Sequence, residues 1–194
     1  MRLVILVLVL LSQLFACGGG PTASEAAHSP GATLDVPDAE MLATYWPTPQ
    51  PVVERMMELG KVSPGKIHFD LGSGDGRFVI AAANRGAESV GYEIDPELIA
   101  RSRKNIHDAG LDSHARIEAG DLLEADFPRA DVVTCFLTPE SYPQVAPRLR
   151  ERLRPGTRVV AYKFPIPDWE PVETISMEDA DPEIPTHQIF LYVM

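Results

Sequence analysis

One stretch decides the fold of this chain: Asp70-Leu71-Gly72-Ser73-Gly74-Asp75-Gly76-Arg77. It links an apolar segment, residues 66–71, which predicts a strand, to residues 78–83, which begin a predicted helix. The glycines let the backbone turn sharply and approach a ligand with no side chain in the way. The spacing is G-x-G-x-G, and Arg77 stands where the dinucleotide fingerprint requires its third glycine. The position between a strand and a helix predicts a ligand site at the strand end; a plain tight turn is the alternative.

The chain on either side of this loop alternates between strand and helix patterns. Further strands are predicted at residues 88–94, 115–119, 131–137 and 157–164, and further helices at residues 52–59, 96–109 and 145–153. Gly60 is expected to end the first helix as its C-cap, and Asp95 to cap the third. Residues 172–176 and 188–193 predict two more strands with no room for a long helix between them. The sequence therefore predicts an α/β fold: a doubly wound, mostly parallel, Rossmann-like sheet with an antiparallel C-terminal edge pair.

Charge and composition exclude several classes of site. The 17 Lys and Arg against 28 Asp and Glu give a net charge of −11, which disfavours a nucleic-acid partner and suits a basic one. The apolar fraction of 45% is enough to fill the core of one domain. The 2 cysteines rule out a disulfide scaffold, and the 5 histidines show no metal-ligand spacing, so no metal site is expected.

The first thirty residues predict a targeting signal rather than a folded segment. Arg2 precedes an apolar run of about fifteen residues, shorter than the roughly 20 needed to cross a bilayer. Residues 1–17 are predicted to be a signal peptide whose end resembles a bacterial lipoprotein signal, with Cys17 as the lipidated residue. Residues 18–40 are predicted to be a flexible linker, and residues 41–194 the globular domain.

This targeting signal predicts a membrane-tethered lipoprotein that faces the periplasm or the outside of the cell. Two alternatives remain open: an ordinary or uncleaved signal, and translation from Met41, which would leave the domain in the cytoplasm. The N-terminal mass of the native protein decides between them.

Three acidic residues lie at or just after the ends of three successive predicted strands. Asp70 ends the first strand, Glu93 ends the second, and Asp121 follows the third. An acid in the position of Glu93 can accept hydrogen bonds from both hydroxyls of a ribose, and Asp121 could accept one from the exocyclic amine of an adenine. Taken singly, Glu93 could be a solvated strand-end carboxylate, and Asp121 a loop acid or helix cap. Their common position around one glycine loop favours a shared binding site.

This constellation resembles the class I, or seven-β-strand, S-adenosylmethionine-dependent methyltransferases over about residues 45–193. In that family the glycine loop approaches the methionine part of the cofactor. The second-strand acid holds the ribose, and the third-strand acid meets the adenine. The resemblance therefore implies S-adenosylmethionine as the cofactor. The residues that it places there are Asp70, Gly72, Ser73, Gly74, Glu93, Asp121 and Leu122.

Two further segments narrow the resemblance: Tyr45-Trp46-Pro47-Thr48-Pro49 before the first helix, and residues 158–169, which read RVVAYKFPIPDW. With the glycine loop they resemble the small protein-lysine methyltransferases of the mitochondrial type, which modify ATP synthase c subunit or adenine nucleotide translocase, and their bacterial relatives. In that group the Tyr-x-Pro-Thr segment folds over the cofactor, which implicates Tyr45 and Thr48. A hydrophobic staple on the first helix is the alternative for Tyr45 and Trp46. We expect a protein substrate with a target lysine, no nucleic acid, and a monomer.

The substrate is expected to enter after the fourth and fifth strands. A lysine nucleophile must be neutral, and an apolar channel lowers its pKa by desolvation. The candidate catalytic residues are Thr138, Glu140, Phe164 and Trp169, with Phe136, Leu137 and Pro139 as further channel walls and Asp168 as a second candidate carboxylate. The alternatives are surface carboxylates for Glu140 and Asp168, and core packing for Phe164 and Trp169. The fourth strand is not followed by the Asn/Asp-Pro-Pro-Tyr motif that amino-methylating enzymes of nucleic acids often carry.

Two other functions remain open from the sequence. A nicotinamide-dependent oxidoreductase shares the sheet and the second-strand acid, but Arg77 replaces the third glycine of its fingerprint. A non-catalytic, membrane-tethered binding protein on a methyltransferase scaffold would agree with the export signal. Binding of S-adenosylmethionine or of NAD would separate these hypotheses.

Overall fold

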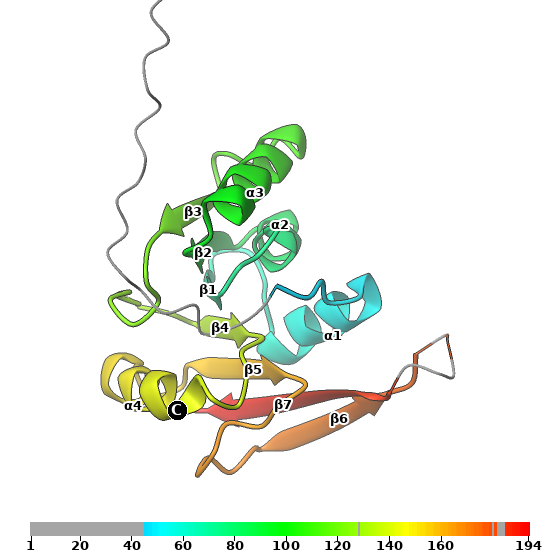
Figure 1. Cartoon of the computed structure of the whole chain (residues 1–194), viewed down its shortest axis with the longest axis vertical. Helices are drawn as coiled ribbons and strands as arrows, with labels where there is room; N and C mark the ends of the chain where they lie inside the picture. The colour runs from blue at the N-terminus through cyan, green and yellow to red at the C-terminus, as the bar shows by residue number, and fades with distance from the viewer. Residues whose placement is uncertain (1–44, 128, 180, 182–184) are drawn as a thin grey trace, which may run out of the picture. The chain divides into compact units, whose positions relative to one another are not determined.

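The computed structural model describes residues 45–127, 129–179, 181 and 185–194. Figure 1 shows the helices and strands that these residues form. The strands are β1 (Ile67–Leu71), β2 (Glu88–Glu93), β3 (Ala115–Ala119), β4 (Val132–Cys135), β5 (Arg158–Tyr162), β6 (Glu173–Met177) and β7 (His187–Val193). The helices are α1 (Gln50–Gly60), α2 (Arg77–Asn84), α3 (Pro96–Asp108) and α4 (Tyr142–Arg152). The predicted signal peptide (residues 1–17) and linker (residues 18–40) lie outside the described residues.

The strands form one 7-stranded sheet in the order β3-β2-β1-β4-β5-β7-β6. β1 pairs in parallel with β2 and β4, β2 pairs in parallel with β3, and β4 with β5. β7 runs antiparallel to both β5 and β6. The predicted doubly wound, mostly parallel, Rossmann-like sheet with an antiparallel C-terminal edge pair is therefore confirmed. Because parallel strands end at the same edge, the loops after β1, β2, β3 and β4 meet there.

Helices cover both faces of the sheet, as a mostly parallel sheet requires (Figure 1). α1 and α2 pack with Val132 of β4 on one face, where α3 adjoins α2. α4 packs with the next residue, Val133, on the other face. Because successive strand residues point to opposite faces, His68 and Asp70 of β1 lie on the α1 side, opposite the side chains that meet α4.

Local signals explain one helix boundary and fail at another. Asp95 caps α3 as predicted, because its side chain accepts hydrogen bonds from two backbone N–H groups of the first turn. The predicted C-cap at Gly60 is wrong, because Lys61 takes the left-handed conformation with φ 55° and Gly60 is the last helical residue. A Cβ on Gly60 would lie 2.7 Å from Cγ1 of Val132. The close packing of α1 on β4 therefore requires glycine here.

The elements that lead toward the expected substrate side also differ from the prediction. β4 and β5 each end two residues before the predicted position. After β5, Lys163 takes a positive φ of 69° and turns the chain out of the sheet. α4 begins at Tyr142 rather than near residue 145, because Pro143 stands in its first turn, where no N–H is needed for the helix.

The described helices are short, and the longest, α3, has 13 residues. None of the helices in residues 45–194 that can be described is long and apolar enough to cross a membrane. The same residues bring together no group of three His, Cys, Asp or Glu side chains that could hold a metal ion.

Candidate active site

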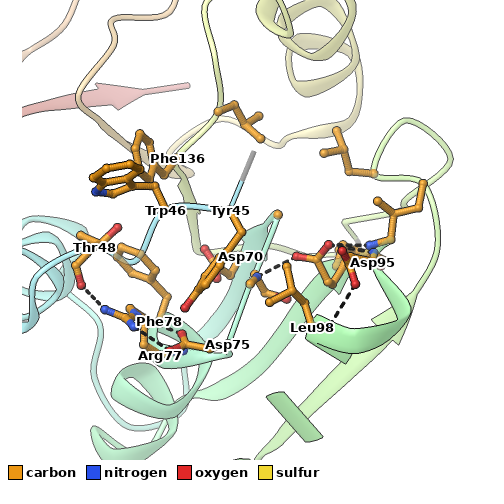
Figure 2. A pocket seen from close by; sticks show the side chains of 18 of the residues that line it. Tyr45, Trp46, Thr48, Asp70, Asp75, Arg77, Phe78, Asp95, Leu98 and Phe136 are labelled. Atoms are coloured by element: carbon orange, nitrogen blue, oxygen red, sulfur yellow. Dashed lines mark hydrogen bonds and ion pairs between the residues drawn. The ribbon is translucent and has the colours of Figure 1, made fainter. Parts of the chain in front are cut away.

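A cavity of about 290 Å³ lies where the loops after β1, β2, β3 and β4 meet (Figure 2). Residues 45–48, which we call the strap, form one wall, and the glycine loop forms another. Every residue predicted to bind the cofactor lines this cavity, namely Tyr45, Thr48, Asp70, Gly72, Ser73, Gly74, Glu93, Asp121 and Leu122. The fold thus brings this predicted set together, while each individual contact with a cofactor stays a prediction.

Arg77 ties the strap to the glycine loop. Its Nη1 donates a hydrogen bond to the backbone carbonyl oxygen of Thr48. Its Nη2 forms an ion pair with Asp75 at 2.6 Å. Burial alone would raise the pKa of Asp75, but the Arg77 guanidinium outweighs burial and holds that pKa below its usual value. The arginine that replaces the third glycine of the dinucleotide fingerprint is therefore a clamp on the strap, a role the sequence pattern did not predict.

Tyr45 packs the strap onto the glycine loop. A Cβ on Gly74 would lie 2.7 Å from Cε2 of the Tyr45 ring. Gly74 also has a φ of 54°, in the left-handed region that favours glycine. Burial raises the pKa of Tyr45, so its hydroxyl stays protonated at neutral pH. The glycine is thus required both for its conformation and for its lack of a side chain.

Glu93, at the end of β2, holds the glycine loop in place through hydrogen bonds from backbone N–H groups. Its Oε2 accepts a hydrogen bond from the N–H of Gly74 at 2.7 Å. Its Oε1 accepts bonds from the N–H groups of Ile94 at 2.9 Å and Asp95 at 3.0 Å. A carboxylate oxygen can accept two bonds, so Oε2 keeps one lone pair for a ligand. The role as a loop support was not predicted, and the contact with a ribose stays a prediction.

Asp121 and Leu122 occupy the loop after β3, beside the cavity. Oδ1 of Asp121 accepts a hydrogen bond from the N–H of Leu123 at 2.8 Å, which is the loop-acid role weighed as the alternative. The same side chain still borders the cavity. The two roles are compatible, and the contact with an adenine stays a prediction.

Asp70, at the end of β1, is a buried carboxylate that is only 2% exposed. Its Oδ1 accepts a hydrogen bond from the hydroxyl of Thr134 at 2.6 Å, whereas Oδ2 has no partner among the described residues. Burial raises the pKa of Asp70 to about 7; the charges of Glu93 and Asp75 add to this rise, and the Thr134 bond opposes it. A buried acceptor without a donor, on a cavity wall, fits a donor supplied by a ligand.

None of the four predicted catalytic residues lines this cavity. Oγ1 of Thr138 is 3.1 Å from Oγ of Ser141, just before α4, and Glu140 is exposed. Phe164 and Trp169 pack against the core on the α4 side of the sheet. The core-packing alternative agrees with the place of these two aromatic residues, and the catalytic roles of all four stay predictions.

Other residues form the side of the cavity where a substrate was expected. Phe136 and Leu137, two of the predicted channel walls, follow β4 and line the cavity. The Phe136 ring makes an edge contact with the ring of Tyr162, with centroids 4.7 Å apart. Trp46 of the strap also lines the cavity and is 71% exposed. Figure 2 shows Trp46 and Phe136 at the same end of the cavity, which makes that end aromatic.

Comparison with known proteins shows the family. A family model described as the ANTKMT methyltransferase domain matches residues 70–173. The chain belongs to the ANTKMT methyltransferase family. A protein-lysine N-methyltransferase of Saccharolobus islandicus (strain REY15A) is 42% identical over 152 residues, which are 77% of this chain and 92% of that protein. The ATP synthase C-subunit lysine N-methyltransferase of Xenopus laevis is 38% identical over 127 residues, 66% of this chain and 56% of that protein. The chain spans about half the length of the vertebrate enzymes of this name.

Solved structures agree with this family. A crystal structure described as an RNA methyltransferase from Salinibacter ruber, in complex with S-adenosyl-L-homocysteine, is 42% identical. It covers 76% of this chain and 93% of that chain, with a TM-score of 0.70. TrmN from Thermus thermophilus, at 18% identity and a TM-score of 0.62, shares the fold alone. This ANTKMT methyltransferase is therefore an enzyme whose cofactor is S-adenosylmethionine, as predicted, and the comparisons lend no support to the nicotinamide alternative.

The described residues fit this cofactor on their own chemistry. Oδ2 of Asp70, which has no partner among the described residues, is an acceptor on the cavity wall that a donor of the cofactor can satisfy. Gly72 and Gly74 leave the backbone open to a close approach, with φ values of 72° and 54°. Glu93 keeps a lone pair on the side of the glycine loop.

Proposed function

We propose that this ANTKMT methyltransferase transfers the methyl group of S-adenosylmethionine to the side-chain amine of a lysine in a protein. The observation that carries the proposal is the Saccharolobus islandicus relative named a protein-lysine N-methyltransferase, which is 42% identical and matched over 92% of its length. An adenine nucleotide translocase lysine N-methyltransferase of Mus musculus, 36% identical over 124 residues, supports the same substrate class.

The cavity supports this chemistry through its aromatic end. The sulfonium cofactor brings an already activated methyl group, so the protein mainly has to align the amine with it. The amine must be neutral to attack, and the apolar walls at Phe136 and Leu137 lower its pKa by desolvation. The net charge of −11 draws a cationic side chain toward the protein. Trp46 offers an exposed aromatic face on which a lysine side chain can pack as it enters.

Transfer of a labelled methyl group tests the proposal. The full chain is incubated with methyl-labelled S-adenosylmethionine and, separately, with the protein and the RNA fractions of its source cells. We expect label in protein, recovered as methyl-lysine after hydrolysis. Prior chemical blocking of the lysine amines in the protein fraction should abolish the label. Label confined to ribonuclease-sensitive material would overturn the proposal.

The RNA fraction is included because the Salinibacter ruber structure, also 42% identical, is described as an RNA methyltransferase. The acidic charge of this chain opposes RNA binding, because contacts with phosphates need a basic surface. The described cavity offers no basic wall, since Arg77, the arginine that lines it, is paired with Asp75.

Trp46→Ala tests where the lysine enters. Loss of a cation–π contact of about 1 kcal/mol should raise the KM for the protein acceptor roughly fivefold. Because Trp46 is largely exposed, the melting temperature should not change. The Kd for S-adenosylhomocysteine, measured by calorimetry, should stay within about twofold of the wild-type value. A KM and a Kd that rise together would place Trp46 at the cofactor instead.

We propose, separately, that residues 1–17 tether the enzyme to a membrane through a lipid on Cys17, with residues 18–40 as the linker. The apolar run behind Arg2 and the glycines after Cys17 support this proposal. Mass spectrometry of the native N-terminus should find a lipidated Cys17. A product that begins at Met41 would overturn the tether and place the enzyme in the cytoplasm. We further propose that the enzyme is a monomer, which sedimentation of the purified chain would test.

A further inference from the structure

A chain of buried polar side chains runs behind the cofactor cavity, across β2, β1 and β4. Oγ of Ser89 lies 2.8 Å from Nδ1 of His68, and Nε2 of His68 lies 2.9 Å from Oγ1 of Thr134. The Thr134 hydroxyl donates to Oδ1 of Asp70 at 2.6 Å. Each of these residues is at most 2% exposed. We call Ser89, His68, Thr134 and Asp70 the polar chain.

The hydrogen atoms of the polar chain have one consistent arrangement when Asp70 is ionised. Thr134 has one hydroxyl proton, which it gives to Oδ1 of Asp70, so its oxygen accepts the N–H of His68 Nε2. Burial lowers the pKa of His68 to about 3, so the ring is neutral. Its Nδ1 then has no proton and accepts a bond from the Ser89 hydroxyl. Every donated proton in the chain therefore points toward Asp70.

We propose that His68 and Thr134 are positioning residues of the cofactor site, which hold Asp70 as a carboxylate and leave its Oδ2 for an N–H donor on the amino-acid part of S-adenosylmethionine. Oδ1 is occupied by Thr134, so Oδ2 is the oxygen that remains without a partner on the cavity wall. Aligned dipoles in a buried network stabilise a charge at its end. This role also accounts for a buried histidine and a buried threonine on neighbouring strands in the middle of the sheet, where polar side chains normally lower stability.

The charged groups that face Asp70 define the pH range in which the proposal can be tested. Glu93 from β2 and Asp75 from the glycine loop bring negative charge toward it. Cys135, the neighbour of Thr134 in β4, lies on the opposite face of the sheet, and burial raises the pKa of its thiol to about 12. His68 titrates far below neutral pH. Neither His68 nor Cys135 therefore changes its charge near pH 7.

Calorimetric titration of the full chain with S-adenosylhomocysteine tests the proposal without a variant. Because the pKa of Asp70 is about 7, the Kd should be about tenfold weaker near pH 6 than near pH 8. The control ligand is 5′-methylthioadenosine, which keeps the adenosine and lacks the amino-acid part. Its Kd should change by less than about twofold over the same range. A change in Kd with pH of the same size for both ligands would mean that the titrating group does not contact the amino-acid part, and would overturn the proposal.

Thr134→Val removes the hydroxyl and keeps the shape of the side chain. Loss of the hydrogen bond raises the pKa of Asp70 further, so the affinity midpoint should move up by about one pH unit. The Kd near pH 7 should then weaken about fivefold and recover at higher pH. Thr134→Ser keeps the hydroxyl and should restore the wild-type profile. A loss by the same factor at every pH would mean a structural role only and would overturn the proposal.

The ring of His68 gives a spectroscopic readout that does not depend on whether a variant folds. With S-adenosylhomocysteine bound, nitrogen NMR should find the Nε2–H tautomer, since Nε2 donates to Thr134 when Asp70 is ionised. An Nδ1–H tautomer or a charged ring would reverse the direction of the polar chain and overturn the proposal.

Discussion

Asp70→Asn removes a buried negative charge and keeps the size of the side chain. In the folded protein the pKa of Asp70 is about 7, against a usual value of 3.8, because the carboxyl is buried. The folded state therefore binds one proton more than the unfolded state between these values. Its stability is highest below the unfolded pKa and falls as the pH rises through the folded pKa. At about 1.36 kcal/mol per pH unit, the ionised carboxylate costs the folded state about 4 kcal/mol above neutral pH.

Asparagine is neutral at every pH, so the variant escapes this cost. Its amide oxygen can still accept the hydrogen bond of Thr134, but its amide nitrogen takes the place of Oδ2, which has no partner among the described residues. An unsatisfied buried donor costs about 1–3 kcal/mol. The net gain without cofactor should be about 2 kcal/mol near pH 8, or roughly 5 °C in Tm for a domain of this size.

Thermal unfolding of the two proteins without ligand, from about pH 4 to pH 9, measures this difference. Near pH 4 we expect no gain or a small loss, then a rising gain up to about pH 7, and a constant gain above it. In parallel, S-adenosylhomocysteine should bind the variant at least tenfold more weakly, about 1.4 kcal/mol, because the charged acceptor is gone. A stability difference that does not vary with pH would refute the raised pKa. An unchanged Kd would refute the role of Asp70 at the cofactor.

Substitutions at Gly74 and Gly60 give further predictions, with Gly65 as a control. Gly74→Ala would put a Cβ 2.7 Å from the Tyr45 ring, displace the strap and raise the calorimetric Kd for S-adenosylhomocysteine. The control is Gly65→Ala, because Gly65 also has a positive φ, of 79°, but has nothing within 4 Å of the added Cβ. This control carries the same kind of backbone strain and should leave the Kd unchanged. Gly60→Ala would put a Cβ 2.7 Å from Cγ1 of Val132. It should lower the free energy of unfolding in urea by about 1–3 kcal/mol. The double variant with Val132→Ala should lose less stability than the sum of the two single variants, because the smaller side chain makes room for the added Cβ. Losses that simply add would contradict the inferred clash between residues 60 and 132.

The parts of the fold that the sequence predicted depend on local signals. The glycine loop, the Asp95 cap and the apolar strand segments each lie within one element or at its boundary. Gly60 was misassigned because the reason for that glycine is not in its own helix: Val132 of β4 approaches it in the folded protein. The end of β5 was misplaced because Lys163, a residue with no turn propensity of its own, takes a positive φ.

In the candidate site, too, some residues could be predicted from the sequence and others could not. The predicted cofactor residues lie at or just after the ends of parallel strands, or precede α1, and the sheet topology brings such positions together. The predicted catalytic residues depended on the course of the chain after residues 137 and 163, which no local pattern determined. The clamp at Arg77 and the polar chain were missed. His68 and Thr134, polar residues within apolar strands, were the signal that could have revealed the polar chain.

The place of β7 between β5 and β6 has a consequence for biosynthesis. A ribosome makes β6 before β7, yet β6 pairs with β7, and β5 also needs β7 at its outer edge. Until residues 187–193 emerge, the nascent protein therefore carries one strand without a neighbour and a central sheet with an open side. Open strand edges pair readily with other chains, so the interval before β7 becomes available is the one in which chaperone protection would matter for this enzyme. A stalled ribosome or a premature stop codon within β7 would extend that interval and favour aggregation over folding.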